Sequence, residues 1–170
     1  PRLTEEEWQR CLETLLNLGS EPTFVVASGS LPPGVPVDFY AQVARRTEGR
    51  VIVDTSGDAL RLAAEEGVYL LKPNMRELGQ LAGHPIEDEA DQEAVAQDLV
   101  QSQSAQVVIV SLGAAGALVV TDHMMERLRA PNVPVKSKIG AGDSMVAGVV
   151  LALYSGKSLE EAVVFGMAAA

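Results

Sequence analysis

The chain of 170 residues has little of several residue types, and each shortage excludes a class of protein. Its single cysteine, Cys11, excludes an internal disulfide and any zinc site built from several cysteines. Thirteen basic residues stand against 23 acidic ones, and a net charge of −10 argues against a nucleic-acid-binding surface. No apolar run approaches the roughly 20 residues of a membrane-spanning helix, so we predict no membrane span.

The amino terminus lacks the charged and then apolar segment of a secretion signal, so we expect a cytoplasmic protein. The first residue is Pro1 rather than methionine. Residues 160–170 have an apolar helical pattern with no glycine, lysine or proline to end it. We therefore expect these residues to be part of a longer protein, with part of the working site outside them.

The composition that remains is that of a soluble globular domain, with 47% hydrophobic and 21% charged residues. A chain of this length buries about 70% of its extended-chain surface on folding, which is enough for a sizeable core. Aromatic residues make up 4%, so the core must be aliphatic. We predict one partial domain over residues 1–170.

Apolar and β-branched segments alternate with helical patterns along the chain. The segments typical of strands are 23–28, 51–54, 68–71, 107–110, 117–121 and 124–128. Helical patterns separate the first four of them, and two further apolar helices follow the last. Strand–helix alternation predicts an α/β sandwich with a mostly parallel sheet. Glycine turns replace the helices after the fourth strand, which predicts a hairpin or meander near residues 107–128.

The first helical pattern begins with a capping box formed by Thr4 and Glu7. Its apolar residues fall on one helical face, which consists of Trp8, Cys11, Leu12, Leu15 and Leu16. Because Cys11 is on this face, we predict a buried thiol rather than a reactive one.

Standard nucleotide-binding and hydrolase motifs are not present. Gly156-Lys157-Ser158 resembles the end of a P-loop, but Leu151 stands where its first glycine is required. A dinucleotide fingerprint starting at Gly140 fails because Met145 replaces its third glycine. No GxSxG segment occurs, and the two histidines have no ligand-like spacing. The sequence therefore gives no support for a Ser–His hydrolase or a histidine metal site.

The segment Gly140-Ala141-Gly142-Asp143 lies at the start of a predicted helix. Two glycines allow backbone N–H groups to converge on an anion, and a helix N-terminus adds partial positive charge. An acidic side chain in the same turn could take a proton from a substrate hydroxyl, which is the arrangement that phosphoryl transfer needs. The alternative is that Asp143 complements the helix dipole and the glycines only permit a turn.

Four motifs in order resemble the PfkB (ribokinase-like) family of sugar kinases. They are SGSLPPG at 28–34, KPNMRE at 72–77, SLGAAG at 111–116 and PVKSKIGAGDSMVAG at 134–148. Within the family the chain is most similar to the bacterial 6-phosphofructokinases and 1-phosphofructokinases, over their carboxyl-terminal portion. The resemblance implies a ribokinase-like three-layer α/β/α sandwich and ATP-dependent phosphorylation of a ketohexose phosphate, with fructose 6-phosphate converted to the 1,6-bisphosphate. Fructose 1-phosphate and tagatose 6-phosphate remain alternative substrates.

The resemblance also implies roles for individual residues. Asp143 matches the general base that accepts the proton of the sugar hydroxyl, and also lies against the substrate. The residues matching the anion hole are Gly140, Ala141 and Gly142. Ser30 matches a contact to the sugar phosphate.

The implied cofactors are ATP and Mg²⁺, with a monovalent cation as a further candidate. The matching nucleotide-binding residues are Lys72, Asn74, Ser111, Gly113, Gly116 and Ser137. Asn74 and Glu77 match an element that organises Mg²⁺ on the nucleotide phosphates. A plain capping motif explains this pair equally well. Lys138 replaces the usual threonine of the family, which leaves cation preference near the nucleotide open.

Two parts of the family pattern do not occur in these residues. The amino-terminal half normally supplies a Gly-Gly sugar-binding motif and a β-sheet lid, through which we expect a homodimer. The terminal segment that encloses adenine also has no counterpart. We therefore expect the 170 residues alone to bind nucleotide poorly and to turn over little. A non-catalytic nucleotide-binding remnant is the alternative from another functional class.

Overall fold

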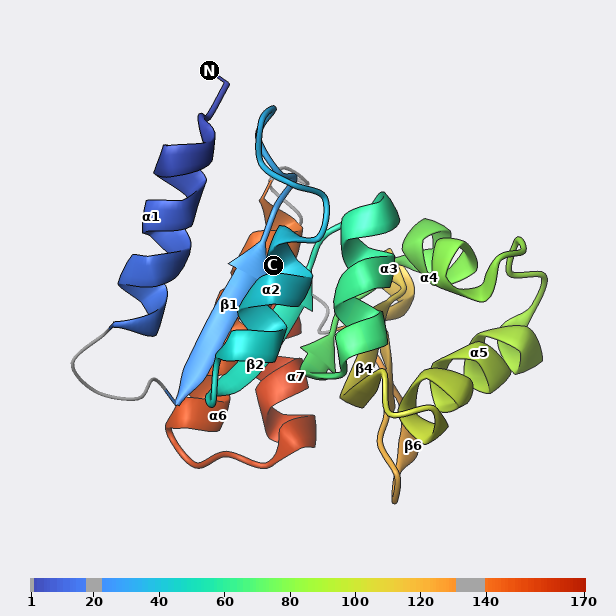
Figure 1. The fold of residues 1–170 in the computed structure, drawn as a ribbon. Helices are drawn as coiled ribbons and strands as arrows, with labels where there is room; N and C mark the ends of the chain where they lie inside the picture. The colour runs from blue at the N-terminus through green and yellow to red at the C-terminus, as the bar shows by residue number, and fades with distance from the viewer. Residues whose placement is uncertain (1, 18–22, 131–139) are drawn as a thin grey trace.

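The computed structural model describes residues 2–17, 23–130 and 140–170. Helices and strands alternate along most of this length (Figure 1). In order, the elements are α1 (Glu5–Leu16), β1 (Phe24–Ser28), α2 (Phe39–Arg46), β2 (Arg50–Asp54), α3 (Gly57–Glu66), β3 (Val68–Leu71), α4 (Met75–Ala82), α5 (Glu89–Gln101), β4 (Ala105–Ser111), the 3-10 turn η1 (Gly113–Ala115), β5 (Ala117–Val120), β6 (Met125–Leu128), α6 (Ala141–Tyr154) and α7 (Leu159–Ala169).

The described strands form one sheet in the order β1-β2-β3-β4-β5-β6. Strands β1 to β4 are parallel, so their carboxyl ends lie along the same edge. Strands β5 and β6 return antiparallel to their neighbours, with Ser111 of β4 opposite Ala117 of β5. The mostly parallel sheet and the meander near residues 107–128 are therefore confirmed.

Helices cover both faces of the sheet and give three layers (Figure 1). Val51 and Val53 of β2 face a core shared with α1 to α5. Ile52, between them, faces the second core with α6 and α7. This alternation follows from the strand geometry, because successive side chains point to opposite faces. The cores are mainly aliphatic, as the composition predicted.

Helix α1 buries less of its apolar face than its sequence pattern predicts. Leu12 is buried against the sheet, and Trp8 is half-buried with an edge-to-face contact to Phe39 at 6.3 Å between ring centroids. Cys11 is exposed, so the prediction of a buried thiol is wrong. The reason is that the helix packs through a thin stripe, and the apolar face is wider than the surface available to cover it.

Helices α6 and α7 pack against each other at very close range. A Cβ atom on Gly166 would lie 2.7 Å from the backbone oxygen of Met145, and one on Gly148 would lie 2.8 Å from the Cα of Gly166. Only glycine permits this approach of two backbones. The contact holds α6 against α7, and both helices pack on the second core of the sheet. Within the described ranges, no helix is both long and apolar enough to cross a bilayer.

Candidate active site

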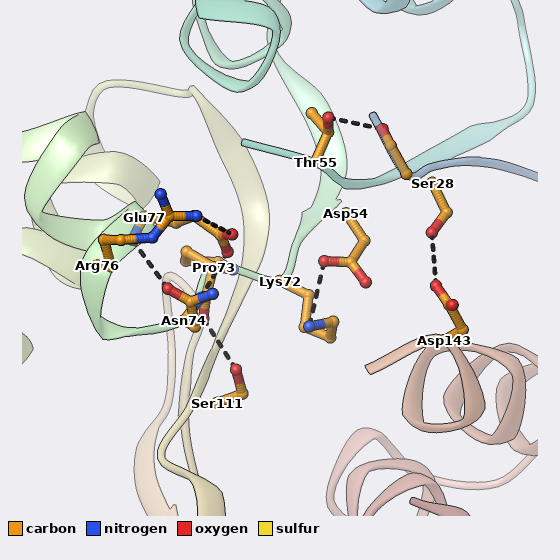
Figure 2. Close-up of polar contacts among 11 residues, drawn as sticks. Ser28, Asp54, Thr55, Lys72, Pro73, Asn74, Arg76, Glu77, Ser111 and Asp143 are labelled. Atoms are coloured by element: carbon orange, nitrogen blue, oxygen red, sulfur yellow. Dashed lines mark hydrogen bonds and ion pairs between the residues drawn. The ribbon is translucent and has the colours of Figure 1, made fainter. Parts of the chain in front are cut away.

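The carboxyl edge of the parallel strands brings together segments that are far apart in the sequence. Ser28 ends β1, and its hydroxyl donates a hydrogen bond to Oδ1 of Asp143 at 3.1 Å (Figure 2). The Asp143 side chain is exposed and comes from the first turn of α6. Ligands in open parallel sheets bind at this edge, so the geometry places Asp143 where the sequence pattern predicted a site.

Helix α6 begins in a way that leaves its first turn open. Gly140 precedes the helix at φ 78° and ψ 1°, a left-handed conformation that glycine adopts without strain. Its carbonyl accepts the first helical hydrogen bond from Ser144 at 2.8 Å, and it has no side chain with which to cap the helix. The backbone N–H groups of Ala141, Gly142 and Asp143 have no partner within the helix, so this turn can accept an anion.

Lys72 and Asp54 form a buried ion pair next to this turn. Lys72 follows β3 and Asp54 ends β2, and Lys72 Nζ lies 3.2 Å from Asp54 Oδ1 (Figure 2). The two side chains are 6% and 15% exposed. A Cβ atom on Gly142 would lie 3.8 Å from both Lys72 Nζ and Asp54 Oδ2. The ion pair therefore faces the first turn of α6 with no side chain between them.

The charges around Asp54 are mostly negative. Burial raises the pKa of Asp54 above its ordinary value, and the neighbouring carboxylates of Glu77 and Asp143 raise it further. Lys72 opposes these effects through its charge and its hydrogen bond. One ammonium group thus stands among three carboxylates. This is an environment whose electrostatics depend strongly on where that ammonium is held.

Asn74 and Glu77 form the capping box of α4. Oδ1 of Asn74 accepts from the Glu77 backbone N–H at 3.0 Å, and Oε2 of Glu77 accepts from the Asn74 N–H at 2.9 Å. Glu77 is buried, and its other oxygen lies 3.6 Å from Arg76. The capping alternative is therefore confirmed as a structural role. It leaves the predicted role toward Mg²⁺ as a prediction.

The loop after β4 lies beside the Lys72–Asn74 segment. Ser111 pairs with Asn74 in an isolated parallel bridge, and its N–H donates to the carbonyl of Pro73 at 2.9 Å. Gly113 opens the turn η1. Gly116, at φ 107°, closes it with its carbonyl bonded to the Leu112 N–H at 2.9 Å. The glycines of this loop thus form the hairpin turn that the sequence predicted, at the same edge of the sheet as the ion pair.

Ser30 and Ser137 are the remaining predicted site residues. Ser30 is exposed in the loop that follows β1. The start of this loop is held by Tyr40 and Thr55, whose hydroxyls both donate to the Gly29 carbonyl, at 3.1 and 2.8 Å. Ser137 lies outside the described residues, as does its neighbour Lys138.

Two residues of this arrangement, Ser28 and Asp54, were given no individual role from the sequence, although Ser28 begins the SGSLPPG motif. Asp54 gave a usable signal, because it ends a buried strand predicted to point toward the site edge. In the part of the chain that the structure describes, no group of three or more His, Cys, Asp or Glu side chains is arranged to hold a metal ion. A cavity of about 680 Å³ at the opposite edge, lined by Thr47, Arg50 and Gln106 among others, contains none of the predicted site residues.

A family model described as pfkB family carbohydrate kinase matches residues 3–170. The ATP-dependent 6-phosphofructokinase isozyme 2 of Mycobacterium tuberculosis is 43% identical over 172 residues, covering 99% of this chain and 50% of that protein. The 1-phosphofructokinase of Bacillus subtilis is 35% identical over 170 residues, covering 98% of this chain and 55% of that protein. The chain thus spans about half the length of the curated relatives it matches.

Solved structures agree with the sequence matches. Phosphofructokinase-2 from Escherichia coli in complex with fructose-6-phosphate matches with a TM-score of 0.88 at 41% identity, covering 98% of this chain and 55% of that one. The structure of the same protein in complex with potassium matches with a TM-score of 0.90 at 40% identity and the same coverage. Ribokinase from Thermotoga maritima shares the fold, with a TM-score of 0.73 at 24% identity. The match covers 97% of this chain and 53% of the ribokinase chain. The expected ribokinase-like fold is confirmed, and the chain belongs to the pfkB family of carbohydrate kinases.

Proposed function

We propose that this chain carries the catalytic base and the phosphate-binding turn of an ATP-dependent phosphofructokinase that converts fructose 6-phosphate to fructose 1,6-bisphosphate. The observation that carries the proposal is the position of Asp143. Its exposed carboxylate lies in the open first turn of α6, 3.1 Å from the Ser28 hydroxyl and beside the Lys72–Asp54 ion pair. A general base and a set of anion-binding donors thus share one turn of helix.

In the proposed reaction, Asp143 accepts the proton of the sugar hydroxyl as the hydroxyl oxygen attacks the terminal phosphorus of ATP. The bond between that phosphorus and the oxygen bridging to ADP breaks, and ADP leaves with the electron pair. The N–H groups of Gly142 and its neighbours stabilise negative charge on the transferred phosphoryl oxygens. In other enzymes a general base contributes about 10²–10⁴ in rate. A single donor to a developing anion contributes about 10²–10³.

The nucleotide would lie along the same edge of the sheet. This edge is bordered by Lys72, Asn74 and the loop from Ser111 through Gly113 to Gly116. Ser30 would contact the sugar phosphate. The oxygens of Asn74 and Glu77 are of the type that Mg²⁺ prefers, and Mg²⁺ is usually held by one or two carboxylates together with substrate phosphates. The donor set therefore fits a magnesium ion carried on the nucleotide, which would neutralise phosphate charge when bound. A monovalent cation remains part of the proposal, because the Escherichia coli relative has been solved with potassium.

The sugar is proposed on the strength of the relatives. A 6-phosphofructokinase matches at 43% identity and a 1-phosphofructokinase at 35%, so fructose 1-phosphate is the second candidate and tagatose 6-phosphate the third. The experiment is to measure kcat/KM of the full-length protein with each of the three sugar phosphates and Mg-ATP. We expect the highest value with fructose 6-phosphate. Phosphorylation of adenosine or ribose in place of all three would exclude the proposed substrate class.

The base is tested by Asp143→Asn in the full-length protein, with Asp98→Asn as the matched control. Asn keeps the shape of the side chain but cannot accept the proton, so we expect turnover to fall by at least about 10²-fold with Mg-ATP binding retained. Asp98 is exposed on α5, far from the site edge in the fold, and its variant is expected to behave as wild type. Unchanged turnover in Asp143→Asn would refute the assigned base. Loss of activity in both variants would point to a general effect on folding.

The proposed homodimer and the low activity expected of the 170 residues alone both depend on segments that the relatives have in their other half. Size-exclusion chromatography with light scattering on the full-length protein tests the first, and turnover of the isolated chain beside it tests the second. A monomeric full-length enzyme would contradict the dimer. Full activity of the isolated chain would show that closure by other segments is not required.

A further inference from the structure

Asp54 has no role in the function proposed so far, yet it takes part in the most buried ion pair of the described residues. Its partner Lys72 is 6% exposed, whereas each of the other ion pairs has at least one side chain that is 39% exposed or more. Removing two charges from water costs several kcal/mol per ion, and well-packed apolar residues often serve stability as well or better. Stability alone is therefore a weak reason for these two residues.

The location of the pair points to the site. Lys72 Nζ is 3.2 Å from Asp54 Oδ1, and both side chains face the backbone of Gly142, as the 3.8 Å distances to its absent Cβ show. Gly142 supplies one of the open N–H groups of the first turn of α6. An ammonium held here would lie beside an anion bound by those N–H groups, and a charged donor strengthens binding of a phosphoryl oxygen.

The surrounding charges explain why a positioning carboxylate is needed. The carboxylates of Asp143 and Glu77 both act electrostatically on Asp54. Carboxylates at this range are alternative partners for an ammonium group. If Lys72 paired with Asp143, the ammonium would stabilise the ionised base and make it a weaker proton acceptor. Asp54 holds the ammonium at a fixed place between β2 and β3 and leaves Asp143 bonded to the Ser28 hydroxyl (Figure 2).

We propose that Asp54 is a positioning residue that holds the Lys72 ammonium beside Gly142, where it binds the terminal phosphate of the nucleotide, and away from Asp143. This inference rests on the proposed function of the site. It differs from a structural role in one respect: loss of Asp54 must affect binding of the terminal phosphate more than binding of the rest of the nucleotide.

The first experiment compares Mg²⁺-bound β,γ-imido-ATP with Mg-ADP by isothermal titration calorimetry of the full-length protein. For Asp54→Asn we expect the affinity for the imido-ATP to fall about 10-fold or more and the affinity for ADP to change less than about 3-fold. Asp54→Glu keeps the charge and should recover part of the loss. Asp58→Asn is the matched control, because Asp58 belongs to the same β2–α3 region but its side chain is 75% exposed and pairs with Arg61. It is expected to match wild type.

The second experiment is a double-mutant cycle with Lys72→Met, which also covers the case in which Asp54→Asn alone fails to fold. If Asp54 acts by holding Lys72, the double variant Asp54→Asn/Lys72→Met should bind the imido-ATP and turn over no worse than Lys72→Met alone. Additive losses would overturn the inference. The double variant removes both charges, so it leaves no unpaired ion in the interior.

The outcomes separate this inference from the proposed function. Equal losses of imido-ATP and ADP affinity in Asp54→Asn, or none, would overturn the positioning role even if Asp143→Asn is inactive and the kinase assignment stands. Conversely, undiminished turnover in Asp143→Asn would refute the assigned base. The two binding titrations would then still decide whether Asp54 positions Lys72, since they require no chemistry.

Discussion

Gly166 of α7 lies directly against α6, and its replacement by alanine tests how the fold holds the site. In an ordinary helix, glycine to alanine stabilises by about 0.8–1.0 kcal/mol. Here the new Cβ would lie 2.6 Å from Val149 Cγ2 and 2.7 Å from the Met145 backbone oxygen. The valine can adjust, but the backbone oxygen can move only with α6. Overpacking of this kind costs about 1–3 kcal/mol. The gain offsets part of the cost, so we expect a net loss of up to about 2 kcal/mol in the free energy of unfolding.

The assay is urea denaturation of the full-length protein, read as a lower midpoint at unchanged m-value. Val164→Ala on the same helix is the control, because this side chain is 43% exposed and its loss should change stability by less than about 0.5 kcal/mol. A displaced α6 also moves Asp143, so we expect kcat of Gly166→Ala to fall more than its stability at the assay temperature explains. A variant about 1 kcal/mol more stable than wild type, as in an ordinary helix, would refute the close-contact reasoning.

Two further predictions concern the start of α6 and the buried pair. Gly140→Ala should lower the free energy of unfolding in urea by about 1–2 kcal/mol and lower kcat, because alanine is strained in the left-handed conformation. Gly140→Asn should lose less stability, and equal stability of wild type and both variants would contradict this prediction. Burial raises the pKa of Asp54, so the Asp54 carboxyl keeps its proton to higher pH in the folded state than in the unfolded chain. The contribution of Asp54 to stability is therefore present at low pH and is lost as pH rises through its folded pKa. In urea denaturation near neutral pH, the double variant Asp54→Asn/Lys72→Met should therefore be as stable as wild type or more stable, with a gain of up to about 1–4 kcal/mol in the free energy of unfolding. A clearly less stable double variant would show that the pair supports the fold.

The strands of the sheet were predictable because their signal is local. Each of the first four is a short run of β-branched and aliphatic residues. The predicted strand 107–110, for example, differs from the observed strand Ala105–Ser111 by one or two residues at each end. The change from helical connections to glycine turns after β4 is also local, and it predicted the antiparallel meander. Burial at the margin was not predictable. Cys11 shares the apolar face of its helix with Leu12, but which residue of a face is covered depends on the width of the surface opposite it.

The candidate site shows the same division. Gly140 and Asp143 were found from a pattern within four residues, because the turn and the helix start are local properties. Asp54 was given no role, because a carboxylate at a strand end can serve several functions and the sequence does not show its partner. That partner, Lys72, is 18 residues away and reaches it only through the parallel pairing of β2 with β3. A search for oppositely charged residues at the ends of neighbouring predicted strands would have found the pair.

The two glycines of α6 that face its surroundings do opposite things for the same helix. Gly148 permits the close contact that holds the helix against α7, whereas Gly142 leaves the first turn without a side chain where the ion pair approaches. A helix fixed along its length and open at its start presents its N–H groups in a constant position, which is what stabilisation of a developing charge requires. The mostly apolar sequence of α6 is consistent with this, since Asp143 is its only charged residue and lies at the end that meets the carboxyl edge of the sheet.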